Sequence, residues 1–117
     1  MRFLVILCML GLVACGPSAR LRTIRATYAV ANVSADHLAA YSEAHEAQIV
    51  AGATSPDDGR AQLVAWRDRV DHAEKVLATL YRAIAAASIL DDSHSLTALV
   101  QAAVVLRTEL TAIGVTP

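Results

Sequence analysis

Three side chains that could bind a metal ion or stack on a ligand recur at intervals of four residues: His37, Tyr41 and His45. In a helix this spacing places all three on one side, close to Glu43 and Glu46. Two histidines that share a metal ion must lie on adjacent turns, whereas these two are about 12 Å apart along a helix. The pattern therefore predicts a polar helix face and no metal or haem site.

Adjacent carboxylates occur twice, at Asp57-Asp58 and at Asp91-Asp92. Each pair stands where a helix is predicted to begin, and helix capping explains both pairs without catalysis. The sequence also lacks the sharp, glycine-lined turn that positions a nucleophilic serine in hydrolases. We therefore expect a protein that is not an enzyme and has no cofactor.

A different chemistry is indicated near the start of the chain, at the thiol of Cys15. Arg2 precedes an apolar run over residues 3–13, and small residues follow. A basic start, a short apolar segment and small residues before a cleavage point are the parts of a secretory signal. The run is about 11 residues long, well short of the roughly 20 that span a bilayer.

The segment Leu12-Val13-Ala14-Cys15 resembles the lipobox of bacterial lipoproteins. The resemblance implies that residues 1–14 are a cleaved signal peptide and that Cys15 carries a covalent diacylglycerol and an N-acyl chain such as palmitate. Residues 15–19 would then be a lipidated tether in the cell envelope. Gly16 replaces the Asp that resembles an inner-membrane retention signal, which favours the outer membrane and a domain facing the periplasm. The resemblance covers the signal only.

Composition argues against nucleic acid as a partner and against a disulfide bond. The formal net charge is −1, without the basic excess that binding to nucleic acid requires. Cys8 would leave with the signal peptide and Cys15 would carry lipid, so no thiol would remain for a disulfide or a metal site. The chain is rich in Ala, Leu and Val and lacks alternating apolar and polar runs, which predicts an all-α protein.

The clearest predicted helix spans residues 56–90. Its start is marked by Ser55 as N-cap, Pro56 in the first turn and the carboxylates of Asp57 and Asp58. An apolar stripe of the coiled-coil a/d type follows at Leu63, Trp66, Val70, Ala73, Leu77, Leu80, Ile84 and Ala87.

A partner helix is predicted over residues 18–51, ended by Gly52. Its stripe comprises Leu21, Ile24, Tyr28, Ala31, Ala35, Leu38, Ser42, His45 and Ile49. Ser34 could instead begin a new helix, which leaves a break near Val33 open. The short link to Ser55 predicts an antiparallel hairpin in which Leu38 faces Val70 and Ser42 faces Trp66.

A third, shorter helix is predicted after Asp91-Asp92-Ser93, ending before Gly114 and Pro117. Its stripe of Leu96, Leu99, Ala103, Leu106, Leu110 and Ile113 would pack on the hairpin. The predicted fold is thus a three-helix bundle over residues 20–114, a long antiparallel hairpin with a shorter third helix, preceded by a cleaved signal helix. The third helix would leave a two-helix tip over residues 40–70.

Two surfaces are candidates for contacts. Arg20, Arg22 and Arg25 follow the anchor and could meet lipid headgroup phosphates or simply be solvated. Tyr41, His45 and Trp66 lie at the tip, where two helices are expected to leave the indole open to a partner.

These surfaces favour a non-catalytic interaction or structural protein, held to a membrane by its lipid, that binds a protein partner or self-associates. A small-molecule or metal-binding periplasmic lipoprotein is an alternative. A phage or mobile-element lipoprotein acting in lysis or exclusion is another.

Overall fold

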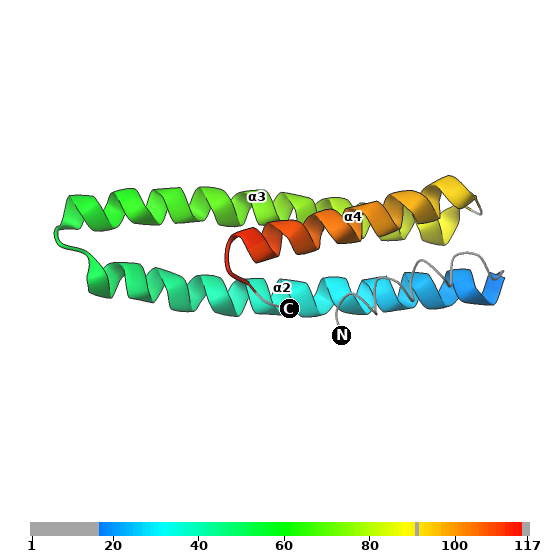
Figure 1. Cartoon of the computed structure of the whole chain (residues 1–117), viewed down its shortest axis with the longest axis horizontal. Helices are drawn as coiled ribbons and strands as arrows, with labels where there is room; N and C mark the ends of the chain where they lie inside the picture. Colours follow the sequence, from blue (N-terminus) through cyan, green and yellow to red (C-terminus); the bar gives the residue numbers. More distant parts are fainter. Residues whose placement is uncertain (1–16, 91, 116–117) are drawn as a thin grey trace.

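The computed structural model describes residues 17–90 and 92–115, which form three helices and no strand. They are α2 (Pro17–Gly52), α3 (Pro56–Ile89) and α4 (Ser93–Ala112). The helices lie along a rod of 58 × 27 × 17 Å, with α2 and α3 antiparallel and α4 shorter (Figure 1). The prediction of an all-α bundle, a long hairpin with a shorter third helix, is confirmed. The predicted signal helix and Cys15 lie outside the described residues.

Both later helices begin where their capping residues predict. The hydroxyl of Ser55 accepts a hydrogen bond from the backbone N–H of Asp58 at 3.1 Å, and Pro56 occupies the first turn of α3. The carboxylate of Asp92 accepts from the backbone N–H of Ser95 at 2.7 Å and caps α4. Each bond satisfies an N–H group that has no partner within the helix, so these short polar segments fix where the helices begin.

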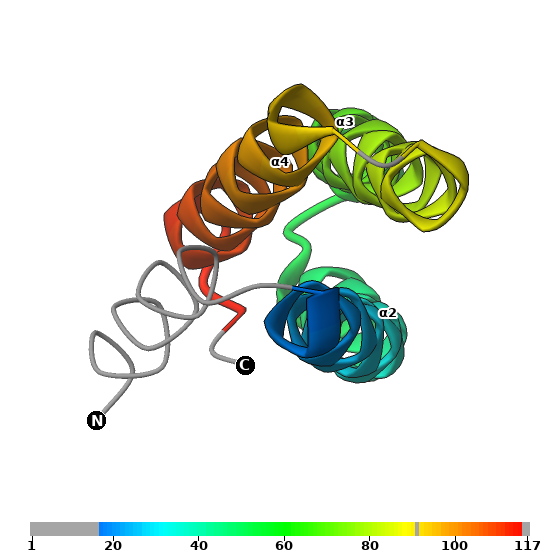
Figure 2. The same cartoon turned by 90° about the vertical axis from the view of Figure 1, so that its right-hand side faces the viewer.

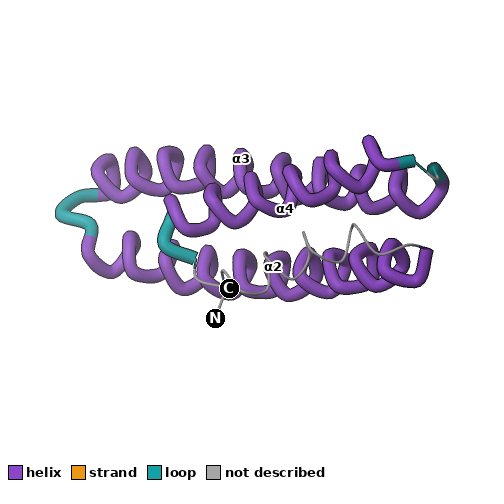
Figure 3. The backbone as a smooth tube through the Cα atoms, turned by 45° about the vertical axis from the view of Figure 1, so that its right-hand side comes forward, coloured by secondary structure: helices purple, strands orange, loops and turns teal. Residues whose placement is uncertain are grey.

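Helix α2 is continuous through residue 34, and the break considered near Val33 does not occur. Ser34 is only 2% exposed, so its side chain contributes to the buried face and not to a helix cap. Because α2 is a single helix, the hairpin has one link at each end of the rod. Figure 3 shows the α2–α3 link and the α3–α4 link at opposite ends.

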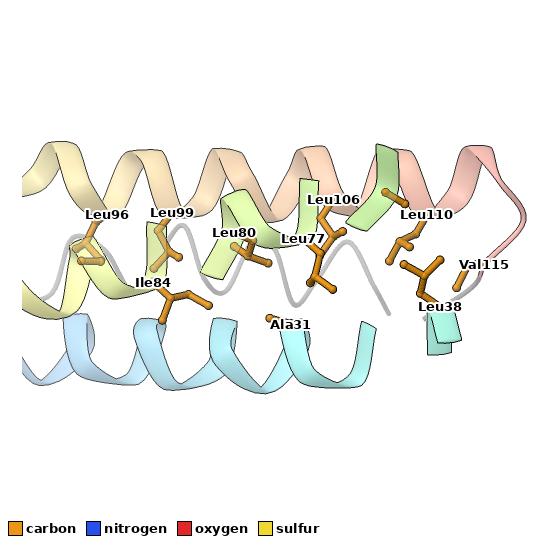
Figure 4. Packing of buried hydrophobic residues seen from close by; sticks show 12 residues of the cluster. Ala31, Leu38, Leu77, Leu80, Ile84, Leu96, Leu99, Leu106, Leu110 and Val115 are labelled. Atoms are coloured by element: carbon orange, nitrogen blue, oxygen red, sulfur yellow. The ribbon is translucent and has the colours of Figure 1, made fainter. Parts of the chain in front are cut away.

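The core is a column of leucines and small residues between the helices. From α3 and α4 it takes Leu77, Leu80, Ile84, Leu96, Leu99, Leu106 and Leu110, and from α2 it takes Ala31 and Leu38 (Figure 4). The view along the rod shows α4 beside α3, with α2 across from both (Figure 2). Burial of these large side chains against small ones on α2 lets three helices share one core.

The buried face of α2 differs from the predicted stripe over its first half. Leu21 and Tyr28, placed in the stripe, are 48% and 51% exposed, whereas Thr23 and Thr27 are fully buried. The predicted stripe takes account of α3 alone, whereas α2 contacts both α3 and α4.

Threonine is suited to a buried position on α2 because its hydroxyl can bond to a carbonyl of its own helix. The hydroxyl of Thr23 donates to the carbonyl of Ala19 at 2.9 Å, and that of Thr27 donates to the carbonyl of Thr23 at 2.7 Å. Each bond gives a buried hydroxyl group a partner within α2.

The predicted register of the hairpin is confirmed at the pair of Ser42 and Trp66. The indole Nε1–H of Trp66 donates to Oγ of Ser42 at 3.2 Å. Leu38 and Val70, also predicted to face each other, line one groove between α2 and α3.

Candidate functional site

Four side chains at the distal part of the hairpin form a compact ring cluster: Tyr41, Ser42, His45 and Trp66. The rings of His45 and Trp66 have centroids 4.1 Å apart, and Tyr41 lies 5.8 Å from each of them. Tyr41 and His45 are stacked at an interplanar angle of 11°. Because Tyr41 and His45 are one helical turn apart on α2, one helix supplies both rings that cover the indole.

The prediction that two helices leave Trp66 open is wrong, since this side chain is only 4% exposed. The rings of Tyr41 and His45 cover the indole, and Ser42 accepts its N–H. Tyr41 and His45 remain half-buried at the edge of the cluster. The cluster therefore packs the hairpin, and its indole is not a free anchor for a partner.

The end of α4 docks on the same cluster. Gly114 has φ +91°, and Val115 N–H donates to Leu110 O at 2.8 Å while Gly114 N–H donates to Thr111 O at 3.1 Å. These two bonds are those of a Schellman C-cap, in which glycine adopts the left-handed backbone at little cost. A Cβ on Gly114 would lie 2.7 Å from the hydroxyl of Tyr41, so the turn packs directly against that ring.

The polar residues considered as metal ligands do not converge. Across residues 17–90 and 92–115, no three His, Cys, Asp or Glu side chains are grouped closely enough to hold a metal ion. His37 is exposed, His45 is stacked within the ring cluster, and His72 Nε2 lies 3.2 Å from Glu109 Oε1 on α4. These three histidines thus lie in separate environments.

Arg20 has a structural role that sequence reasoning missed. Its guanidinium donates to the carbonyls of Ala87 and Asp92, each at 2.7 Å, and to the carbonyl of Leu90. It also donates to the hydroxyl of Ser95 at 2.9 Å. The guanidinium thus binds carbonyls at the end of α3 and at the N-cap of α4, and it ties the α3–α4 link to α2.

This geometry corrects the proposed headgroup role for one of the three arginines. Arg20 is partly buried and directed at the protein, because a planar guanidinium can bind several carbonyls at once. Arg22 and Arg25 are exposed on the first turns of α2 and remain candidates for contact with headgroups. No local pattern separates these three residues, since the carbonyls that bind Arg20 lie about 70 positions away.

A groove of about 340 Å³ lies between α2 and α3, with no α4 residue among its walls. Its floor is apolar, formed in part by Leu38, Val70 and Leu77, and three glutamates line it: Glu43, Glu46 and Glu74. Arg67 Nε lies 3.5 Å from Glu46 Oε1 at this end of the hairpin. The groove is thus an acidic-edged depression on the face of the hairpin that α4 leaves uncovered.

Comparison with known proteins adds no functional assignment, because no protein-family model, curated protein or solved structure matches this chain. None of the helices described, α2 to α4, is long and apolar enough to cross a membrane.

Proposed function

We propose that this chain is a lipid-anchored, non-catalytic interaction protein of a bacterial envelope, held at the periplasmic face of the outer membrane. The observation that carries the proposal is the segment Leu12-Val13-Ala14-Cys15 after a short apolar run. In this proposal the thiol of Cys15 becomes the thioether of a diacylglycerol, and its amino group is acylated after residues 1–14 are removed.

The energetics of lipid anchoring agree with this chemistry. Each buried CH₂ contributes about 0.8 kcal/mol, and one acyl chain gives only reversible membrane binding. The chains of a diacylglycerol together with an N-acyl chain make the attachment durable. A helical domain held in this way needs no membrane-spanning segment of its own.

The fold supports an interaction role by its shape. Helix α2 begins at Pro17, two residues after Cys15, and runs the length of the rod. A protein anchored at Cys15 would hold its α3–α4 link near the lipid and present the α2–α3 link about 54 Å away, at 1.5 Å per helical residue. This arrangement suits a short spacer that meets a protein partner or a second copy.

The test compares Cys15→Ser with Cys8→Ser in the producing bacterium. Cys15→Ser removes the acylated thiol, so we expect no palmitate incorporation and a protein that is unprocessed or soluble. Cys8→Ser changes a cysteine of the signal that is not acylated in this scheme, so palmitate incorporation and membrane fractionation should be normal. Equal palmitate incorporation in both variants would refute the anchor.

The interaction role requires its own measurement. The acylated protein is captured from detergent-solubilised membranes, and its own mass in detergent is measured by light scattering. A specific co-purified protein or a defined oligomer is expected. A monomer that captures the same proteins as an unrelated lipoprotein would contradict the interaction role while leaving the anchor intact.

A further inference from the structure

The rod carries exposed apolar side chains at the end where α2 begins. Ile89, the last residue of α3, is 82% exposed, which is the highest value among the large apolar side chains described. Leu90 beside it is 50% exposed, and Leu21 on α2 is 48% exposed. We call the surface made by Ile89 and Leu90 the apolar base. The consecutive aliphatic side chains exposed at this end of the rod make it a candidate contact surface.

The apolar base is held in position by several hydrogen bonds. The backbone N–H of Leu90 donates to Ala86 O at 2.8 Å, and the guanidinium of Arg20 binds the carbonyls of Ala87 and Leu90 on either side of Ile89. These bonds give the N–H of Leu90 and the carbonyls of Ala87 and Leu90 partners within the protein. The aliphatic side chains of Ile89 and Leu90 remain exposed, and Asp92, Ser93 and His94 are exposed after them.

The charges around the apolar base are mixed. Arg22 and Arg25 are exposed on the adjoining turns of α2, while the carboxylate of Asp92 is engaged with the backbone N–H of Ser95. Exposed guanidinium groups on the early turns of α2 and exposed aliphatic side chains at the same end of the rod match the chemistry of a bilayer surface, where phosphates lie above the acyl chains.

The position of the proposed lipid anchor indicates that the apolar base meets the bilayer. This inference rests on the proposed function. Cys15 precedes Pro17 by two residues, and an extended chain spans at most about 3.6 Å per residue. An acylated Cys15 therefore lies within about 7 Å of the start of α2. Figure 1 shows that the start of α2 and the α3–α4 link lie at the same end of the rod.

We propose that the apolar base contacts the lipid bilayer, with Ile89 and Leu90 in the interfacial region and Arg22 and Arg25 at the headgroups. The lipid on Cys15 holds this end at the membrane, and the apolar base gives the rod a second contact that limits its tilt. The rod then stands away from the membrane with its α2–α3 link outermost.

Site-specific fluorescence tests the contact, using Ile89→Cys and Val64→Cys in the full chain. Val64 is also exposed, at 56%, but lies on α3 near the α2–α3 link, so it is the matched control. In the processed protein Cys15 is acylated and Cys8 is removed, so each variant offers one thiol for an environment-sensitive dye. The labelled protein is reconstituted in vesicles of phosphatidylethanolamine and phosphatidylglycerol, and a sample is kept in detergent.

On vesicles, the dye at position 89 should emit to the blue and be quenched by lipids with brominated acyl chains, with a several-fold loss of quenching by iodide. The dye at position 64 should be quenched by iodide and not by brominated lipid. Equal iodide quenching at both positions would overturn the membrane contact. A blue shift at position 89 that depends on protein concentration in detergent would also overturn it, in favour of a contact between copies.

Palmitate incorporation is measured on the same preparations, which separates the two proposals. Normal acylation with an iodide-accessible position 89 refutes the apolar base alone. Absent acylation refutes the anchor and, with it, the contact that the anchor is proposed to hold.

Discussion

The indole Nε1–H of Trp66 donates to Oγ of Ser42 at 3.2 Å, and this bond joins α3 to α2 within the ring cluster on which the end of α4 docks. Together with the ring of His45, 4.1 Å away, it buries a large aromatic side chain between two helices. A buried indole needs a partner for its N–H, and serine supplies one without adding bulk.

Tryptophan fluorescence reports this burial directly. Because Trp66 is the only tryptophan and is 4% exposed, we expect emission at short wavelength and weak quenching by acrylamide at concentrations where the protein is monomeric. Ser42→Ala should lower the free energy of unfolding by about 1 to 3 kcal/mol, since it leaves the buried indole N–H without its acceptor. A red-shifted, readily quenched emission from the wild-type monomer would contradict the ring cluster.

Gly114→Ala tests the docking of the α4 end on Tyr41. The new Cβ would lie 2.7 Å from the tyrosine hydroxyl, and the backbone at φ +91° is unfavourable for alanine by about 1 to 2 kcal/mol. We expect a lower free energy of unfolding, partly restored when Tyr41→Phe removes the hydroxyl. Gly52→Ala is the control, because nothing lies within 4 Å of its added Cβ. Equal effects of both alanines on denaturant unfolding would show that the C-cap is misplaced.

Leu80→Ala tests the leucine column. Leu80 is fully buried, and removal of its side chain should cost about 2 to 5 kcal/mol, because the surrounding helices cannot close the cavity fully. Val64→Ala removes an exposed side chain of the same helix and should change the free energy of unfolding by less than about 0.5 kcal/mol. Thermal or denaturant unfolding of both variants gives the comparison, and similar midpoints would refute the assignment of the core.

Arg20→Lys tests whether Arg20 stabilises the α3–α4 link, in contrast to the exposed Arg22. Lysine keeps the positive charge but cannot reach several carbonyls at once, so the α3–α4 link should loosen and the protein should be less stable. Arg22→Lys is matched in chemistry and exposed, so its effect on the unfolding midpoint should be within experimental error. Faster amide hydrogen exchange around residues 87–95 in Arg20→Lys alone would locate the effect. Identical exchange in the two variants would contradict the assigned role.

Acid should destabilise the cap of α4. The backbone N–H of Ser95 is the main cause that holds the pKa of Asp92 below its ordinary value, followed by the hydroxyl of Ser95. A carboxyl whose folded-state pKa is depressed stabilises the fold above its unfolded pKa of about 3.9, and this contribution is lost as the pH falls toward the folded pKa. Asp92→Asn retains a capping oxygen without titrating, so its stability should depend less on pH below about 4. An unchanged acid-unfolding curve would contradict this role.

The sequence by itself determined the helices of this protein and the points where they begin and end. Ser55, Asp92 and Gly114 act on backbone groups within five residues of themselves, so their effect can be read from the local chain. The apolar period also predicted the hairpin register, including the pairing of Ser42 with Trp66. The lipid anchor at Cys15 is likewise a sequence inference and stays a prediction.

The tertiary structure alone decided which side of each helix is buried and which polar side chains bind other groups within the protein. Thr23 and Thr27 are buried while Tyr28 is exposed, and α2 contacts α4 as well as α3, so a stripe that faces α3 alone does not define its buried face. Arg20 binds carbonyls far along the chain, and His45 covers Trp66 across the hairpin. Such contacts depend on how the helices are placed around one another, which a period of three and four residues along a single helix cannot specify.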